Sequence, residues 1–333
     1  KDNRRWKRLE IGFFYSLVIS QIWTVQIVKF EFDIKENAID SFNEALSKYE
    51  EGEAGDLKAF KFSITHLSHC IELVLKMYLQ SLDESLVFSK CYKEVAKRAK
   101  SDGTSLLDAF KALESEGYDF ENLVKGQTNP YTVTVDQALA VAMCEVCSAT
   151  GNNLVDQNFI DDINWMKSLR NSIEHFQFEF TAKDVRLCVG RLVRGLSEFT
   201  DIFSIFDLEE EIGTKKYHIF EILADEYEHE LKEASIDVRE AKHALFAGVR
   251  PKHQMDIEWN VYTCGSCGND TMIPNADSST GYRCTVSSCG NEESEEIEVD
   301  CDICGCPWPN GEMSYWEDTY DNVCPRCENP EAW

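Results

Sequence analysis

The cysteine pattern of the last seventy residues limits most strictly what this part of the chain can form. Nine of the fourteen cysteines lie there, and eight of them form two repeats of a short pair, a spacer and a second pair. The eight are Cys264, Cys267, Cys284, Cys289, Cys301, Cys304, Cys324 and Cys327. Two cysteine knuckles separated by a hairpin-sized spacer are what a tetrahedral zinc site with four cysteine ligands requires. The sequence therefore predicts two zinc ribbons in tandem.

Details of the spacing refine this prediction. A glycine after the second cysteine of a pair, as at Gly268, favours a tight turn whose amides point at the thiolates. Four residues rather than two separate Cys284 from Cys289, so this pair is the looser one. Cys306 is a ninth cysteine that could replace a neighbouring ligand, although Cys304 completes its pair more naturally. Because four thiolates fill the coordination of Zn²⁺, both ions are expected to be structural and not catalytic.

The clustering of the cysteines also predicts a cytoplasmic protein, since disulfide frameworks are typical of small secreted domains. One observation points the other way. Ile11 to Val28 is an eighteen-residue stretch without a charge, and four basic residues precede it between positions 4 and 8, as in a membrane anchor. Its serine, threonine and glutamine residues make it a poor anchor, and residues 30–34 alternate apolar and charged side chains as a strand does. A strand or packed extension is therefore favoured over a membrane span.

Residues 36 to about 247 carry apolar side chains at three- and four-residue steps, which predicts helices with one buried stripe. Thr134 to Gln137 and Thr181 to Asp184 have the form of capping boxes that open two of these helices. A loop is expected over 117–131, and a break at 101–104. The expected helices span 36–50, 57–79, one or two segments within 83–117, 134–147, 159–176, 181–203 and 215–247.

The predicted fold class is therefore mainly α, with a helix bundle followed by a small β-rich module that carries the two zinc ribbons. The length of 333 residues suggests roughly two domains with their connections. The expected division is an N-terminal extension over 1–35, a helical domain over 36–210, a helical connector over 211–250 and the tandem ribbons over 251–333.

The net charge of −27 disfavours duplex DNA as a partner, because neutralising phosphates requires clustered Lys and Arg. Contact with RNA must then be local, through a few cations in a cleft. Residues 251–333 contain three basic and seventeen acidic residues. This charge also disfavours binding of nucleic acid by the ribbons. Their aromatic residues either fill the small ribbon cores or form an apolar surface for a protein partner. These aromatic residues are Trp308, Tyr315, Trp316 and Trp333.

The candidate catalytic centre is the stretch 170–175, which reads RNSIEH near the end of an expected helix. Arg170 supplies a planar cation, Asn171 an amide and His175 an imidazole, which are the groups needed for chemistry on a phosphate. In an ideal helix Arg170 and His175 are rotated by about 140° from each other, whereas Asn171 and His175 are about 40° apart. One helix cannot easily aim Arg170 and His175 at the same point. The spacing therefore predicts a site shared between two copies, or a helix end that bends.

Two other groups of residues are weaker candidates. His66, His69 and Cys70 could share a helix face, but no matching carboxylate or cysteine pair stands nearby in sequence, so ordinary hydrogen bonding and filling are expected. Cys144 and Cys147 are spaced as Cys-x-x-Cys within an expected helix and have no second pair, so they are expected to be core thiols.

The Arg-Asn-x-x-x-His motif on the third main helix, followed by residues 176–180 and another long helix, resembles the HEPN domain of higher eukaryotes and prokaryotes. The segment 71–79, with Glu72 and Lys76, resembles the second helix of that family. The resemblance covers roughly residues 36 to 206. It implies a homodimer that cleaves RNA without a metal ion, in toxin–antitoxin, CRISPR or antiviral defence systems.

The resemblance implies that His175 is a general base or acid, that Arg170 holds the scissile phosphate and that Asn171 orients one of them. The 2′-hydroxyl of the RNA attacks and leaves a 2′,3′-cyclic phosphate. Lys167, one turn before Asn171, is a candidate RNA contact. Gln177 stands where HEPN toxins silenced by a nucleotidyltransferase antitoxin often carry Tyr, which puts that mode of control in doubt.

The alternative function is a non-catalytic scaffold or adaptor. In this interpretation the helix bundle serves dimerisation and the zinc ribbons recruit a protein partner. RNSIEH is then either a structural helix end whose Arg and His form salt bridges, or part of a HEPN-like domain that serves only for dimerisation.

Overall fold

A computed structural model describes residues 32–126, 130–175, 180–257, 259–316 and 319–330. The apolar stretch from Ile11 to Val28, the position of Gln177 and the side chain of Trp333 lie outside the described residues. Contacts divide the chain into Lys1–Asp33 and Ile34–Trp333. The finer division into four domains stays a prediction.

The expected strand over residues 30–34 is wrong at its described end. Ile34 is the first residue of helix α2 (Ile34–Glu53), and the side chain of Phe32 is 60% exposed rather than half-buried. Ile34 packs on the core in line with Ala38 and Phe42, which are spaced by four residues. The four-residue spacing of these apolar side chains, which suits a helix, thus decides the structure at Ile34, and the alternation of apolar and charged side chains over 30–34 does not.

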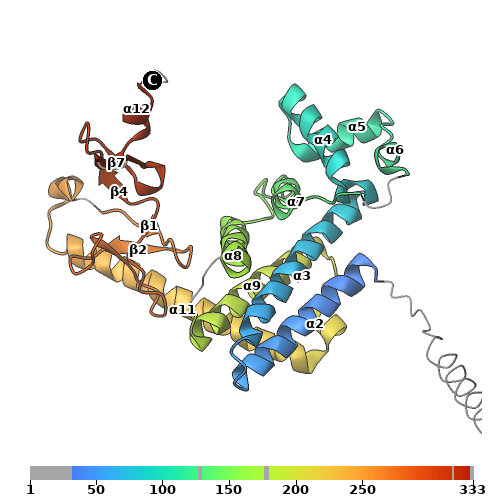
Figure 1. Cartoon of the computed structure of the whole chain (residues 1–333), viewed down its shortest axis with the longest axis horizontal. Helices are drawn as coiled ribbons and strands as arrows, with labels where there is room; N and C mark the ends of the chain where they lie inside the picture. Colours follow the sequence, from blue (N-terminus) through green and yellow to red (C-terminus); the bar gives the residue numbers. More distant parts are fainter. Residues whose placement is uncertain (1–31, 127–129, 176–179, 258, 317–318, 331–333) are drawn as a thin grey trace, which may run out of the picture. The chain divides into compact units, whose positions relative to one another are not determined.

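Helices α2 and α3 (Ala59–Leu82) pack against each other as a hairpin. Helix α2 extends beyond both expected bounds, whereas α3 begins two residues later and ends three residues later than expected. Phe42 and Leu46 on α2 and Ile64 and Leu67 on α3 are almost completely buried. Helix α3 runs through the middle of the helical part and contacts α2, α7, α8 and α9 (Figure 1). It therefore provides the surface on which the candidate site is built.

The next segment contains short helices, as expected for residues 83–117. They are η1 (Glu84–Val87), α4 (Ser89–Asp102), α5 (Leu106–Ser115) and α6 (Glu121–Val124). The predicted break at 101–104 is confirmed, because α4 ends at Gly103 in the left-handed region. Helix α6 lies within the expected loop over 117–131 and was not predicted, since four residues carry no periodic signal.

Helix α7 (Val135–Ala142) begins with the predicted capping box at Thr134 and Gln137. It ends five residues before Cys147, so the expected helical spacing of Cys144 and Cys147 is wrong. The chain turns instead, and Val146 pairs with Asn153 in an antiparallel bridge. The turn is held by long-range contacts that the sequence pattern does not contain, including a 3.1 Å hydrogen bond from the Tyr78 hydroxyl to Glu145.

The motif lies at the end of α8 (Gln157–His175), which is followed by α9 (Ala182–Phe203), α10 (Leu208–Ile212) and α11 (Thr214–Phe246). The second predicted capping box, Thr181 with Asp184, opens α9. Helix α11 packs closely along α9 at Gly190. A Cβ atom at this position of α9 would lie only 2.0 Å from the carbonyl oxygen of Leu223 on α11, so the close approach requires glycine. The helical part thus includes α11 in its packing.

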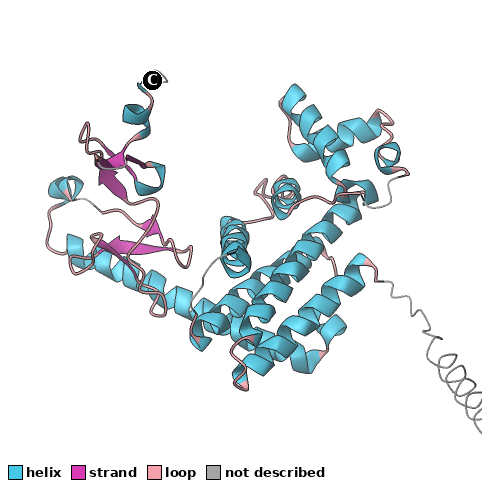
Figure 2. Ribbon diagram, in the orientation of Figure 1, coloured by secondary structure: helices cyan, strands magenta, loops and turns pink. Residues whose placement is uncertain are grey.

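The C-terminal part consists of short antiparallel strands (Figure 2). The first ribbon (residues 262–289) has a three-stranded sheet, and the second ribbon (residues 298–328) has two two-stranded sheets. The strands are β1 (Tyr262–Thr263), β2 (Asp270–Pro274), β3 (Tyr282–Cys284), β4 (Glu298–Asp300), β5 (Pro307–Pro309), β6 (Ser314–Trp316) and β7 (Tyr320–Val323). The short helices of this part are η2 (Pro251–Asp256), η3 (Asn310–Glu312) and α12 (Pro325–Glu328).

The predicted fold class is confirmed: the chain is mainly helical, with a small β-rich C-terminal region that carries two clusters of four cysteines. Among the described residues, no helix combines the length and the apolar character that crossing a membrane would require.

Candidate functional site

Arg170 lies where α8 crosses α3, and two carboxylates hold its guanidinium. Nε donates to Oε1 of Glu174 and Nη1 donates to Oε2 of Glu72, each over 3.0 Å. Glu72 also accepts a hydrogen bond of 2.7 Å from the buried ammonium of Lys76. Burial by itself would raise the pKa of Glu72, but the two cations bring this pKa below its usual value. Arg170 is therefore fixed in an ionised network at the junction of two helices.

His175 is the last residue of α8, and its side chain is 70% exposed. Its Nε2 atom lies 4.0 Å from Oε2 of Glu174. Within the described ranges, no hydrogen bond or ion pair joins Arg170 to His175. One chain therefore presents both side chains near the end of α8 but does not bring them together.

The other two predicted site residues lie on the surface of the same helix. Asn171 is exposed. Lys167 forms an ion pair with Asp136 near the start of α7. The structure thus places both side chains on α8, within reach of solvent.

Sequence reasoning missed two residues of this network. Glu174 follows Arg170 by four positions, and this i,i+4 spacing of opposite charges is a signal that could have revealed the pair. The hydroxyl of Thr132 accepts a 3.1 Å hydrogen bond from Lys76, 56 positions away. No local pattern could have predicted that contact.

His69 and Cys70, two of the weaker candidates, behave as ordinary packing residues. Nδ1 of His69 is 2.9 Å from the hydroxyl of Ser41, and burial lowers the pKa of this histidine. Cys70 is completely buried, which raises the pKa of its thiol. In the part of the chain that the structure describes, only the two four-cysteine clusters have side chains grouped closely enough to hold a metal ion.

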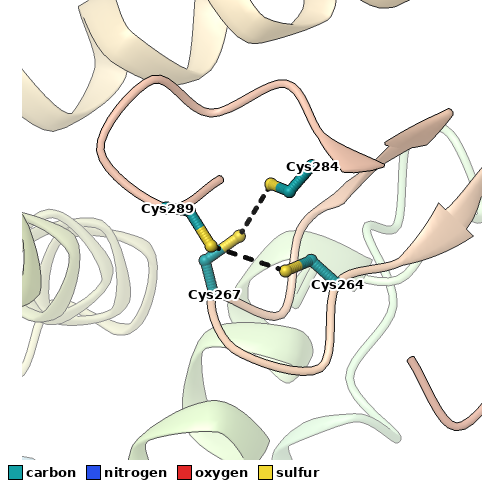
Figure 3. Close-up of side chains that lie close together, drawn as sticks. All are labelled: Cys264, Cys267, Cys284 and Cys289. Carbon is teal, nitrogen blue, oxygen red and sulfur yellow. Dashed lines mark hydrogen bonds between the residues drawn. The ribbon is translucent and has the colours of Figure 1, made fainter. Parts of the chain in front are cut away.

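The first four-cysteine cluster joins both knuckles of the first ribbon (Figure 3). Cys264 Sγ lies 3.6 Å from Cys289 Sγ, and Cys267 Sγ lies 3.7 Å from Cys284 Sγ. These separations are far too long for disulfides. They fit a tetrahedral ion with metal–sulfur bonds of about 2.3 Å, which requires sulfur atoms about 3.8 Å apart. The wider spacing of Cys284 and Cys289 therefore does not prevent both from joining the cluster.

Polar groups surround the sulfur atoms of this cluster. The side-chain amide of Asn291 donates to Sγ of Cys264 over 3.4 Å, and the Thr271 hydroxyl lies 3.2 Å from Sγ of Cys284. Hydrogen bonds of this kind orient metal ligands and disperse the negative charge of thiolates. The first cluster is thus built as a closed site for an ion.

The second cluster joins Cys301, Cys304, Cys324 and Cys327. Sγ of Cys304 lies 3.8 Å from Sγ of Cys324, again the separation that a tetrahedral ion requires. The backbone N–H of Cys324 donates to Sγ of Cys301 over 3.4 Å and lowers the pKa of that thiol to about 6. Cys304 is exposed, so this cluster is more open than the first.

Cys306 is also exposed and does not belong to the second cluster. Its carbonyl oxygen accepts a 3.0 Å hydrogen bond from the backbone N–H of Cys301. Both clusters could therefore hold an ion with four protein ligands and no open position. Tetrahedral sulfur sites of this type suit zinc or iron–sulfur centres.

Two aromatic residues of the second ribbon lie on its surface. The side chain of Tyr315 is 65% exposed and that of Trp316 is 38% exposed. The Trp316 ring meets the ring of Tyr320 edge to face, with 6.4 Å between the centroids. Trp308 is half-buried in β5. At least two of the aromatic residues therefore form surface rather than core.

Comparison of the chain with protein-family models, with curated proteins and with solved structures found no match. The resemblance to the HEPN domain thus depends on the motif itself and on the helices that carry it.

Proposed function

We propose that this protein is a metal-independent endoribonuclease of HEPN type, in which Arg170 and His175 cleave RNA at an interface between two copies of the chain. The observation that carries the proposal is the network at the junction of α3 and α8. Arg170 from the motif helix is bonded there to Glu72, which is bonded in turn to Lys76. These are the residue types, on the two helices, that the resemblance implies.

The network supports a role for Arg170 in binding a phosphate. Its Nε and Nη1 atoms are held by carboxylates. Within the described residues, Nη2 has no hydrogen-bond partner. A guanidinium fixed by two carboxylates loses little further side-chain entropy when it binds a ligand through the remaining nitrogen. Nη2 therefore binds a phosphate oxygen and stabilises the charge that develops on it.

The chemistry follows from groups already present in RNA and in the motif. The 2′-hydroxyl oxygen attacks the adjacent phosphorus, and the bond from phosphorus to the 5′-oxygen of the next nucleotide breaks. One imidazole takes the proton from the 2′-hydroxyl, and a protonated imidazole gives a proton to the leaving 5′-oxygen. The products are a 2′,3′-cyclic phosphate and a free 5′-hydroxyl. Asn171 orients His175 or the phosphate.

The need for two proton-transfer groups, together with the exposure of His175, supports a homodimer. A second copy brings another His175, so that one histidine serves as base and the other as acid. It also excludes water from an imidazole that is 70% exposed in one chain. Because the chain carries a net charge of −27, binding of RNA relies on local cations such as Arg170 and Lys167.

The remaining features fit a regulated cytoplasmic effector. Both four-cysteine clusters hold structural Zn²⁺, and catalysis uses no metal ion. The exposed aromatic residues of the acidic second ribbon contact a protein partner or regulator. Such an enzyme acts as a toxin or as an antiviral defence effector.

The test is a digestion of single-stranded RNA by zinc-loaded wild type and by Arg170→Ala, with analysis of the product ends. Wild type is expected to leave 2′,3′-cyclic phosphates, and the variant to cleave about 10²- to 10³-fold more slowly. Arg98→Ala is the matched control. Arg98 is 34% exposed against 32% for Arg170, and it also pairs with two acidic residues, Asp102 and Glu116. Equal loss in both variants would show that the effect is not specific to the motif.

A second candidate function is the non-catalytic scaffold or adaptor. It is favoured by the surface aromatic residues Tyr315 and Trp316, which are suited to a protein partner. It is also favoured by the ion pairs of Arg170, which a structural helix end would need. Dimeric wild type that leaves RNA intact under all conditions would support this alternative.

A further inference from the structure

The first ribbon is attached to the helices through the backbone of its first cysteine knuckle. Trp165 of α8 donates from Nε1 to the carbonyl oxygen of Ser266 over 3.1 Å. Arg191 of α9 donates from Nη1 to the carbonyl oxygen of Cys267. Gly268 ends this turn with φ +65°, and a Cβ there would lie only 3.3 Å from the Trp165 ring. The knuckle and α8 are therefore in close contact.

Arg191 connects this knuckle to the interior of the helical part. Its side chain is 2% exposed, and Nε donates over 2.6 Å to Oδ1 of the buried Asp162 on α8. The guanidinium also lies 4.4 Å from the centre of the Trp165 ring. A buried guanidinium requires acceptors for its N–H groups, because each unpaired group carries a desolvation cost. The Cys267 carbonyl is one of these acceptors, so a folded knuckle is needed to satisfy Arg191.

The second knuckle of the first ribbon is held by α11. Oε1 of Glu230 accepts from the Ser287 hydroxyl over 2.6 Å and from the Ser288 N–H over 3.0 Å. The Thr285 hydroxyl donates over 3.0 Å to the carbonyl oxygen of Ala234. Both halves of the first four-cysteine cluster are therefore bound to helices, and the ion between them would join α8 and α9 to α11.

Among the described residues 259–316 and 319–330, the hydrogen bonds that hold the knuckles of the second cluster come from within the ribbon and not from a long helix. The Asp302 carboxylate accepts from the backbone N–H groups of Asp321 and Asn322, over 2.9 and 2.8 Å. All three residues belong to the second ribbon itself. The two clusters therefore differ in what their folded knuckles support.

We infer that metal occupancy of the first four-cysteine cluster regulates the RNA site by fixing α8, with Trp165 and Arg191 as positioning residues. The inference rests on the proposed function, since it concerns regulation of the same site. Trp165 precedes Arg170 by five residues, or about 7.5 Å along the helix. A small cysteine knuckle depends on its ion for order. Loss of the ion therefore releases the carbonyls that hold Trp165 and Arg191, and α8 loses its fixed position.

The test compares two double variants of the full chain, Cys264→Ser/Cys267→Ser and the matched Cys301→Ser/Cys304→Ser. Zinc content, hydrogen exchange of residues 157–175 and RNA cleavage are measured on each. Wild type is expected to hold about two zinc ions and each variant about one. Exchange should accelerate about tenfold or more in the first variant only, as expected for the loss of a hydrogen bond to a charged group. The rate of RNA cleavage by that variant should fall together with the protection of residues 157–175 from hydrogen exchange.

A second substitution keeps the inference testable if the first double variant does not fold. Trp165→Phe removes the N–H donor, retains an aromatic ring and leaves all eight cysteines in place. It is expected to retain both ions and to exchange faster than wild type over residues 157–175. Unchanged exchange in Trp165→Phe, or in a folded first variant that has lost one ion, would overturn the inference. The two proposals can also fail separately. If the variants exchange faster over residues 157–175 but wild type does not cleave RNA, the first ribbon does hold α8 in place and the proposed ribonuclease activity is refuted.

Discussion

Replacement of His175 by alanine is expected to lower RNA cleavage by about 10²- to 10⁴-fold, the usual contribution of a general acid–base group. The expected loss is large because the imidazoles of RNSIEH are the groups that move protons in the proposed mechanism. Folding should change little, since the side chain is 70% exposed at the end of α8. Substitutions at such surface positions usually alter the free energy of unfolding by less than about 0.5 kcal/mol.

The measurement is the rate of single-stranded RNA cleavage, with sedimentation to verify that the dimer persists. His229→Ala is the matched control, because His229 is 75% exposed on α11 and also lies near a glutamate, Glu233. The control should cleave at the wild-type rate. Unchanged cleavage by His175→Ala would remove this residue from the mechanism.

Replacement of Asp162 by alanine is expected to produce the largest loss of stability of any single substitution considered for α8. The Asp162 side chain is 4% exposed, and its two oxygens accept from Arg191 and Arg194. Removing the carboxylate leaves two cations without their counter-ion in the interior. Breaking a buried pair in this way typically costs about 3 to 5 kcal/mol. That is a large part of the roughly 5 to 15 kcal/mol by which folded domains are stable.

Unfolding of the zinc-saturated variant by denaturant, followed through its helical circular dichroism, measures this loss. Asp136→Ala serves as the control, since Asp136 pairs with Lys167 while 59% of its side chain is exposed. Surface pairs of this kind contribute at most about 1 kcal/mol. Similar unfolding midpoints for the Asp162 and Asp136 variants would contradict the structural role assigned to the Asp162 network.

The sequence predicted the long helices well because their apolar residues repeat with the helical period, and it predicted the starts of α7 and α9 because capping boxes open them. Thr134 and Thr181 both cap as expected. The prediction failed where long-range contacts decide the local structure. The chain turns before Cys147, where Glu145 is bonded to Tyr78 on another helix, and Ile34 joins a helix whose core partners lie further along the chain.

The candidate sites were also predictable from the sequence where local spacing defines them, and not where long-range contacts do. The eight zinc-ligand candidates were recognisable because a metal ion imposes a short spacing on its ligands, and the structure groups all eight into two clusters. The i,i+4 pair of Arg170 with Glu174 was also within reach of the sequence. By contrast, the contact of Arg191 with the Cys267 carbonyl joins residues 76 positions apart. Only the folded chain reveals that the first ribbon holds the motif helix.

The central claim is that the RNA supplies its own nucleophile, and a single 2′-deoxy substitution tests it most directly. An RNA oligonucleotide with mapped cleavage positions is compared with one that lacks the 2′-hydroxyl only on the 5′ side of one of these positions. Attack by the 2′-hydroxyl predicts that cleavage disappears at the substituted position and continues at the others. Cleavage at an undiminished rate at the substituted position would contradict the proposed mechanism.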